Sequence, residues 1–145
     1  MAGSSARNDP YGAFNFLVVI DGVEVAAFSE ASGLESTVDV IEYRNGSDDT
    51  TVRKLPGLTK YTNLVLKRGF TDDRSLWEWH KTVLDGQVDR RSVSVRLLNE
   101  AREPALRFEL QNAWPCRWSG PNFDAGRSAV AIETLEICHE GIEFE

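Results

Sequence analysis

The chain has 145 residues, of which 41% are hydrophobic and 27% are charged. This length and composition are typical of one globular domain, and the chain is too apolar to be disordered. Sixteen basic residues against twenty-three acidic ones give a net charge of -7, so the molecule as a whole repels nucleic acid and anionic membrane surfaces. We therefore expect a single soluble domain, residues 1–145, without sequence-specific contacts to nucleic acid.

The first ten residues, MAGSSARNDP, are small and polar and lack the apolar stretch of a secretion signal. We interpret residues 1–10 as a flexible N-terminus. No apolar run approaches the ~20 residues that a helix needs to cross a bilayer. We expect synthesis in the cytoplasm and no membrane insertion of the chain, with any export by another route such as lysis.

Strands are predicted for most of the first half of the chain. Residues 14–28 form two β-branched and aromatic runs around Asp21-Gly22, a typical two-residue hairpin turn. Residues 36–43 and 61–68 alternate apolar and polar side chains, as half-buried strands do. Between them lies the polar segment 44–57, which has almost nothing to bury. Loops of this length are usually functional or disordered, so an interaction arm and a floppy hairpin tip are both open at this point.

One helix is predicted for residues 71–86. Leu76, Trp79 and Val83 fall on one helical stripe, with His80 beside it. Carboxylates at Asp72 and Asp73 are placed to cap its N-terminus, and Gly86 is placed to end it. Further strands are expected at 92–98, 105–111 and within 130–144. The order of strands, one helix and more strands predicts a mainly β fold, an antiparallel barrel or sandwich with one packed helix.

The sequence lacks the spacing of the common catalytic and phosphate-binding motifs. Cys116 and Cys138 show no metal-ligand pattern, and we expect two free, largely buried thiols. His80 fits the edge of the helix stripe better than the role of a base. Spacing alone leaves a Cys116–His139 dyad open, although nothing supports it. We expect no catalytic residue, no cofactor and no metal site.

The four tryptophans raise the alternative of a small carbohydrate-binding module, in which aromatic rings stack on sugars. Trp77 and Trp79 are explained by packing of the helix on the sheet. Trp114 and Trp118 remain ambiguous on this ground, and saturable sugar binding by a monomer would favour the module.

The segment 110–126, LQNAWPCRWSGPNFDAG, concentrates residues that interrupt regular strands. Proline cannot donate to a strand ladder, and glycine permits unusual backbone angles. We predict that this segment bends a strand at a barrel corner, with two tryptophans anchored in the core. The residues of this predicted bend are Trp114, Pro115, Trp118, Gly120 and Pro121.

Several segments together resemble the inner tube proteins of contractile phage tails and of phage-tail-like injection particles. In chain order they are DPYGAFNFLVVIDG, FSEASGLES leading into VIEYRNG, RKLPGLTKYTNLVLKRG, LWEWH, NAWPCRWSGPNFDAG and AIETLEICHEGIE. They run from Asp9 almost to the last residue. Each segment is weak by itself, but their joint order and spacing are specific.

The resemblance implies a structural subunit that forms hexameric rings, which stack into a hollow tube that sheath contraction drives through a target envelope. Implied partners are further copies of the chain, a sheath protein, baseplate or spike hub and terminator cap proteins, and cargo effector or DNA in the lumen. Pairing of exposed strand edges between identical copies until a ring closes is a physical way to avoid open aggregation.

By the same resemblance, the polar arm reaches between subunits or into the adjacent ring. Its opposite charges offer a means of fixing the register of stacking. The interface residues expected on this ground are Arg44, Asn45, Asp48, Asp49, Arg53, Lys54 and Leu55.

Overall fold

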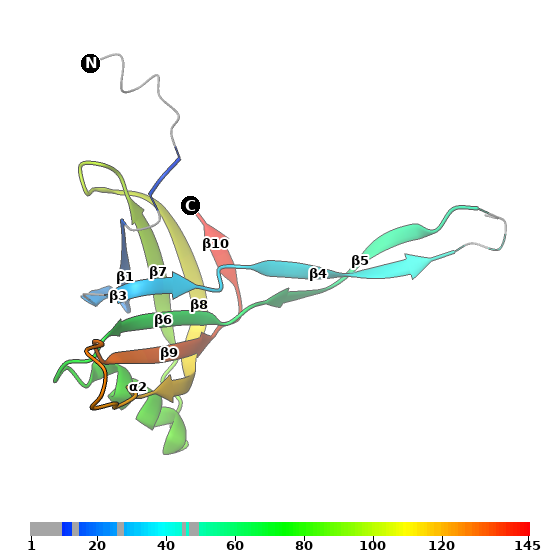
Figure 1. Ribbon diagram of the computed structural model, residues 1–145. Coiled ribbons are helices and arrows are strands. Elements are labelled where there is room, and N and C mark those ends of the chain that lie inside the picture. Colours follow the sequence, from blue (N-terminus) through cyan, green and yellow to red (C-terminus); the bar gives the residue numbers. More distant parts are fainter. Residues whose placement is uncertain (1–9, 13–14, 26–27, 45, 47–49) are drawn as a thin grey trace, which may run out of the picture.

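A computed structural model describes residues 10–12, 15–25, 28–44, 46 and 50–145. A barrel-like body carries one helix against its side, and a two-stranded arm projects from it (Figure 1). Of the predicted flexible N-terminus, all but Pro10 lies outside the described residues. The elements are β1 (Phe16–Ile20), β2 (Val23–Val25), β3 (Phe28–Ser32), β4 (Ser36–Tyr43), β5 (Arg53–Tyr61), β6 (Leu64–Gly69), α2 (Ser75–Leu84), β7 (Arg91–Leu98), β8 (Pro104–Ser119), β9 (Ile132–Cys138) and β10 (Ile142–Phe144).

The body is one antiparallel sheet with the strand order β2-β1-β7-β8-β9-β6-β3, and β10 pairs with β8 beside this path. The strands at the two ends of the path, β2 and β3, are separated in the chain only by residues 26 and 27. A connection this short spans roughly 10 Å at most, so the two ends of the sheet must lie close together. Chain connectivity therefore curls the sheet into the barrel that Figure 1 shows. The barrel alternative of the sequence analysis is the correct one.

The hairpin predicted around Asp21-Gly22 is confirmed. Val23 pairs with Ile20, so the turn has two residues, and both adopt positive φ angles of 51° and 77°. Positive φ at both positions is the geometry of a type I′ turn, whose twist matches that of the flanking strands. An aspartate tolerates this conformation and a glycine adopts it without steric cost.

Strand β8 connects the two parts of the barrel. Its first half pairs with β7 and β10, whereas its second half, from Trp114 onward, pairs with β9. The register shifts between these halves, around Asn112, which has a φ angle of 52°, and shifts again between Pro115 and Arg117. We predicted that regular strand ends at residue 111, but it continues to Ser119, because the irregular residues are absorbed as bulges.

Helix α2 is shorter than predicted and begins at Ser75 rather than at residue 71. Arg74 is its N-cap, without a side-chain capping bond. The expected cap Asp73 instead accepts a hydrogen bond from the Ser75 backbone N–H at 3.0 Å and pairs with Arg68, and these contacts hold the pKa of its carboxyl below the usual range. Gly86, with a φ angle of 78°, ends the helix as expected.

The core lies inside the barrel and beneath the helix. Leu76 and Trp79 bring the apolar stripe of α2 into it, as the periodicity predicts. Trp79 also donates its indole N–H to the backbone carbonyl of Asp89 at 2.7 Å, so its polar atom is satisfied. The other buried apolar side chains of this cluster come from the barrel strands and are Val18, Ile20, Leu64, Leu66, Val93, Val95, Leu110, Ala113, Leu135 and Ile137.

One ion pair is buried among these apolar groups. Arg68 of β6 and Glu133 of β9 are only 4% and 2% exposed, and their Nε and Oε1 atoms lie 2.5 Å apart. The second carboxylate oxygen of Glu133 accepts the indole N–H of Trp118 at 3.0 Å. Arg68 also reaches Asp73 before α2 at 3.2 Å. The pair therefore joins two strands, β8 and the start of the helix at one point.

No helix among the described residues is long and apolar enough to cross a membrane.

Replacing Glu133 by alanine should destabilise the monomeric subunit by about 3–5 kcal/mol, because it leaves the buried Arg68 guanidinium without its main partner. Urea unfolding at a concentration that keeps the protein monomeric measures this loss. Glu24→Ala on β2 is the control, because Glu24 is exposed and should change stability by no more than about 0.5 kcal/mol. Equal losses in the two variants would contradict the role of the pair.

Candidate interaction surface

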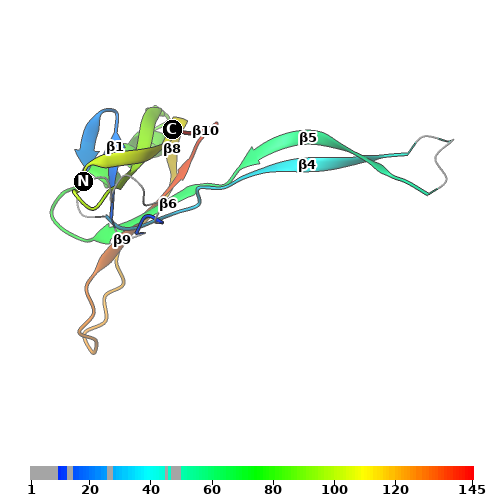
Figure 2. The ribbon, with the colours of Figure 1, turned by 90° about the horizontal axis from the view of Figure 1, so that it is seen from above.

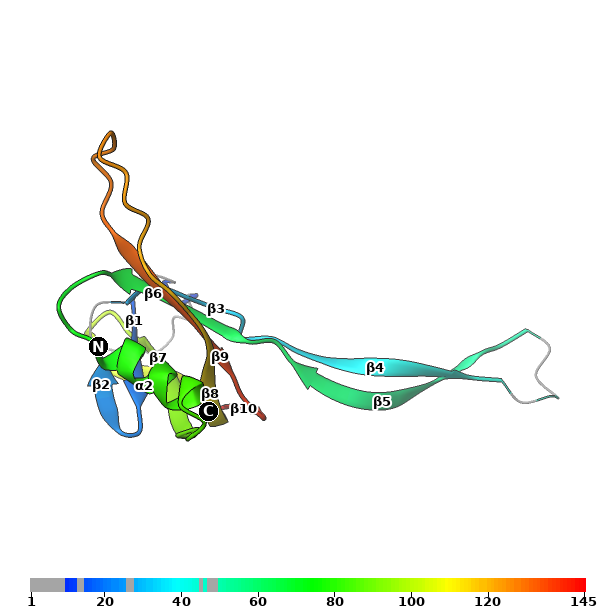
Figure 3. The same ribbon diagram turned by 90° about the horizontal axis from the view of Figure 1, so that it is seen from below.

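The most distinctive surface is the arm formed by β4 and β5. The two strands pair only with each other, as a separate two-stranded sheet that starts at Ser36 and returns at Tyr61. It projects far from the body in every view (Figures 1, 2 and 3). Among the described residues, the arm is the largest part of the structure that lies outside the sheet of the body.

The structure corrects the extent of the arm. The polar segment 44–57 is not one long loop, because residues 53–57 belong to β5 and residues 53–56 pair with the far end of β4. Polar residues form a strand here because main-chain pairing with β4 satisfies their backbone groups. The arm is thus residues 36–61, with 44–52 as its tip.

The predicted interface residues are divided between strand and tip. Arg53, Lys54 and Leu55 lie in β5, where they pair with Tyr43, Glu42 and Ile41 respectively. Arg44 directly follows β4. The remaining three, Asn45, Asp48 and Asp49, lie outside the described residues.

Apolar side chains cover the arm. Sequence reasoning described residues 44–57 as polar and predicted a half-buried strand at 36–43, but β4 is exposed along nearly its whole length because the arm does not pack on the body. Each of the following is at least 44% exposed: Val38, Val40, Ile41, Tyr43, Val52, Leu55 and Leu58. A two-stranded hairpin is at best marginally stable in water, and a contiguous exposed apolar surface usually marks an interaction site. The arm therefore has the properties of a segment that another surface covers.

The register of the arm places apolar side chains on both of its faces. Successive side chains of a strand point to opposite sides, and paired residues point to the same side. One face thus carries Ile41, Tyr43 and Leu55, and the other carries Val38 and Val40. Because neither face packs on the body, both faces are open to neighbours.

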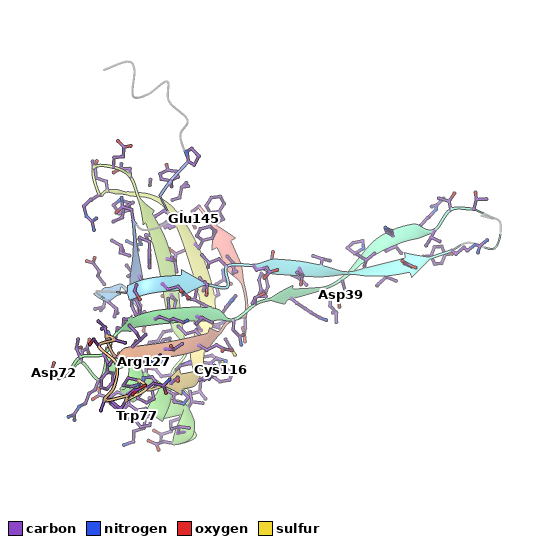
Figure 4. All side chains as sticks on the ribbon, in the orientation of Figure 1. Asp39, Asp72, Trp77, Cys116, Arg127 and Glu145 are labelled. Carbon is purple, nitrogen blue, oxygen red and sulfur yellow. The ribbon has the colours of Figure 1, made fainter. Side chains whose placement is uncertain are left out.

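A bulge divides the arm near its middle. Two residues of β5, Gly57 and Leu58, stand opposite the single residue Asp39. A Cβ atom on Gly57 would lie 3.1 Å from the Asp39 carbonyl oxygen, so a larger residue would push the strands apart. Leu58, in the same bulge, is the most exposed apolar side chain of the arm at 72%. The Lys60–Asp39 ion pair spans this position at 3.2 Å, and Asp39 is labelled on the arm in Figure 4.

The base of the arm is held by backbone contacts. Thr62 donates its N–H to the Glu35 carbonyl at 3.1 Å, so the two connections between arm and body are tied together. Gly33 has a φ angle of 97°, and a Cβ atom there would lie 2.0 Å from the carbonyl oxygen of Asn63. Only glycine fits this crossing, which fixes the direction in which the arm leaves the barrel.

The residues of the predicted bend lie along the second half of β8 and just after it. Pro115 is buried and Trp114 is half-buried. Trp118 is half-buried, packs on the core, and lies with its ring centroid 4.9 Å from that of Trp77. A Cβ atom on Gly120 would approach the Trp118 ring to 3.2 Å, and Pro121 is half-buried. Their role in shaping a barrel corner stays a prediction.

The cysteines are free, but they are half-buried rather than largely buried. Burial and the neighbouring Cys138 thiol raise the pKa of Cys116 to about 12. A catalytic thiol needs the opposite shift, because the thiolate is the nucleophile.

The structure gives Cys116 and His139 different partners. The Cys116 thiol lies 3.5 Å from the Glu136 carbonyl oxygen, whereas His139 Nε2 lies 2.9 Å from the Thr62 carbonyl oxygen at the base of the arm. His80 Nδ1 lies 3.1 Å from the carbonyl oxygen of Pro115, a contact between helix and sheet. Within the described part of the chain, no group of three or more histidine, cysteine and acidic side chains is arranged to hold a metal ion.

Comparison with known families gives one match. The family described as T4-like virus tail tube protein gp19 matches residues 12–143, nearly the whole chain. A comparison with curated proteins finds no match.

Several solved structures share the fold over nearly the whole chain. One, described as the PVC sheath-tube complex of an extracellular contractile injection system in the extended state, is 26% identical with a TM-score of 0.89, covering 100% of this chain and 97% of its own. The cap that terminates the tube of the anti-feeding prophage is 27% identical with a TM-score of 0.88, covering 97% and 93%. Hcp1 from Flavobacterium johnsoniae is 16% identical with a TM-score of 0.57, covering 90% and 94%, and shows a similarity of fold alone.

Replacing Gly33 by alanine should lower the melting temperature of the monomer by at least about 4 °C, because the new side chain collides with the Asn63 backbone and the φ angle is positive. Thermal unfolding followed by circular dichroism measures the shift. Gly69→Ala in β6 is the control, since a Cβ atom there meets nothing within 4 Å. If Gly33→Ala has the same melting temperature as the control, the base of the arm can rearrange freely.

Cys116 should react with iodoacetamide at pH 8 at least about tenfold more slowly in the folded protein than in urea, because a pKa of about 12 leaves little thiolate. Mass spectrometry of the peptide that carries Cys116 measures both rates. The difference should shrink as the pH rises toward 12. Equal rates in the folded and unfolded protein would contradict the raised pKa.

Proposed function

The chain belongs to the T4-like virus tail tube protein family, and we propose that its copies form closed rings of six that stack into a hollow tube. It is a structural tube subunit of a contractile tail or injection system. The observation that carries the proposal of ring assembly is the arm, whose apolar side chains are exposed on both faces in a single copy. Other copies of the chain are a partner that is always present and could cover the arm.

The arm is proposed as the link between copies. The sheet of the body ends in β2 and β3, which do not pair with each other, so the body also has free strand edges that copies could pair. The arm adds two unpaired strand edges and two apolar faces that extend beyond the body. We place the predicted interface residues Arg44, Asn45, Asp48, Asp49, Arg53, Lys54 and Leu55 at contacts between copies, within or between rings.

The descriptions of the similar structures suggest which other proteins the tube contacts. Those proteins are described in a sheath-tube complex, a tube-terminating cap and a baseplate to which six-fold symmetry was applied. For this chain we propose a sheath around the tube, a cap at one end and a baseplate at the other. A cargo effector or DNA would pass through the lumen, and the tube would lie in a particle that acts outside the cell that made it.

Neither alternative function gains support from the described residues. Of the four tryptophans, Trp79 is buried and Trp118 is half-buried and packs on the core, so packing accounts for both. The family is one of structural tube proteins, which agrees with a role without catalysis.

Negative-stain electron microscopy with light scattering over a concentration series tests the proposal. We expect rings of uniform width that stack into tubes as the concentration rises. A monomer at every concentration, with or without the baseplate protein, would contradict it.

Replacing Val40 by aspartate should abolish ring assembly and leave the unfolding of the monomer unchanged within about 0.5 kcal/mol. Val40 is 62% exposed on the arm, so the substitution is harmless in a single copy and costly only where a neighbour covers it. Sedimentation velocity and urea unfolding measure the two properties. Glu24→Asp, on the exposed side of β2, is the control and should assemble normally. If Val40→Asp assembles like the wild-type chain, the arm does not lie in the interface between copies.

A further inference from the structure

The two cysteines of the chain lie on the same face of the body, on neighbouring strands. Cys116 belongs to β8 and Cys138 is the last residue of β9, where it pairs with Trp114. Successive side chains of a strand point to opposite sides, so Cys138 and Glu136 share one face of β9. The Cys116 thiol lies 3.5 Å from the Glu136 carbonyl oxygen and 3.9 Å from its carboxylate. Both thiols are therefore on the face that carries Glu136.

The bulge in β8 brings the two thiols together. The register shifts between Pro115 and Arg117, so Cys116 is an extra residue without its own partner on β9. Burial raises the pKa of the Cys116 thiol, and a hydrogen bond with the Cys138 thiol raises this pKa further. Two thiols in hydrogen-bond contact already point toward each other, as the side chains of a disulfide must. Cys116 is labelled on the body in Figure 4.

The surroundings of this cysteine pair favour no other chemistry. Among the described residues, no third histidine, cysteine or acidic side chain joins the pair in an arrangement that holds a metal ion. Asn63 lies 3.7 Å from the Cys116 sulfur and donates to the Glu136 carboxylate at 2.8 Å, so the polar groups beside the thiols pair with each other. Both cysteines are half-buried, which leaves the pair accessible to a small oxidant.

We propose that Cys116 and Cys138 are an oxidation site, at which a disulfide forms between β8 and β9 in an oxidising medium. The bond crosses the bulge, where the hydrogen-bond ladder of the two strands is interrupted. It also closes a loop from residue 116 to residue 138, which contains the exposed side chains of Phe123 and Val130. This inference goes beyond the proposed function and does not depend on assembly into rings.

The reaction needs an oxidant, and a small-molecule disulfide such as oxidised glutathione is of the right class. Cys138 attacks it first, because the raised pKa of Cys116 leaves that thiol little thiolate for an outside reagent. This step forms a mixed disulfide on Cys138 and expels one glutathione thiolate. Cys116 then attacks the mixed disulfide, forms the internal S–S bond and expels the second thiolate. The two cysteine protons and two electrons leave with the two glutathione molecules.

The second step joins two groups that are already neighbours, so their proximity offsets the scarcity of the Cys116 thiolate. The product stabilises the fold because a closed loop restricts the unfolded chain. Reducing compartments keep such thiols free, whereas disulfides persist outside cells. In the particle proposed above, the bond would therefore form after the tube has left the cell that made it.

Oxidation of the wild-type chain at a concentration that keeps it monomeric tests the proposal. The reduced protein is incubated with oxidised glutathione at pH 8 and then unfolded in urea with iodoacetamide, which blocks every remaining free thiol. Mass spectrometry should find the peptides of Cys116 and Cys138 joined, with the loss of two hydrogen atoms. The melting temperature should exceed that of the reduced protein by at least about 5 °C. Dithiothreitol should reverse both changes.

Cys116→Ser and Cys138→Ser are the matched controls, because each leaves one thiol without its partner. Neither variant should gain melting temperature on oxidation, and Cys116→Ser should keep glutathione on Cys138, since the thiol that displaces it is missing. The wild-type measurement stands by itself if a variant fails to fold.

Three results would overturn the proposal: both thiols of the oxidised wild-type chain blocked by iodoacetamide, glutathione retained on either cysteine, or disulfide-linked dimers in place of the internal bond. A bond that forms only in urea would show that the fold holds the two thiols apart, and would overturn it as well. Because the monomer is measured, these results do not depend on whether rings form.

Discussion

Strand β8 is the constraint on which the rest of the structure depends. Its sixteen residues pair first with β7 and β10 and then with β9, so one continuous strand joins both parts of the barrel. The bulges near Asn112 and after Pro115 let it change partners without a break, and the missing N–H of proline costs little in a bulge. Because β8 also carries the helix contact at Pro115 and the Trp118 ring that packs against Trp77, a different register would displace the helix and this ring contact together.

The apolar side chains of the molecule form two groups, one buried in the body and one exposed on the arm. Those of the body fill a barrel whose sheet ends are brought together by the β2–β3 connection, so the body buries its own core. Those of the arm are exposed on both faces, where they contribute nothing to a single copy. An isolated two-stranded sheet gains stability only when something covers it, which is why folding and assembly are separable here. In the proposed assembly, the subunit would fold first and acquire the last part of its packing from its neighbours.

The buried Arg68–Glu133 pair ties several elements of the body together. It joins β6 to β9, and Glu133 accepts the indole N–H of Trp118 on β8. Arg68 also pairs with Asp73, whose carboxylate accepts the Ser75 N–H at the start of α2. The Cys116 thiol and the His139 ring each contact a backbone carbonyl, of Glu136 and of Thr62 respectively, so both take part in the packing of the body.

The sequence by itself determined the features that depend on a few neighbouring residues. The Asp21-Gly22 turn, the apolar stripe of α2 and the stop at Gly86 follow from local backbone preferences and periodicity, and the order of elements determined the mainly β class. Only the tertiary structure decided which segments pair. Residues 53–57 form a strand because β4 lies beside them, and the Trp77 and Trp118 rings meet because α2 packs on β8. Such contacts join residues that are far apart in the chain. They form only when the barrel folds, so no local sequence pattern predicts them.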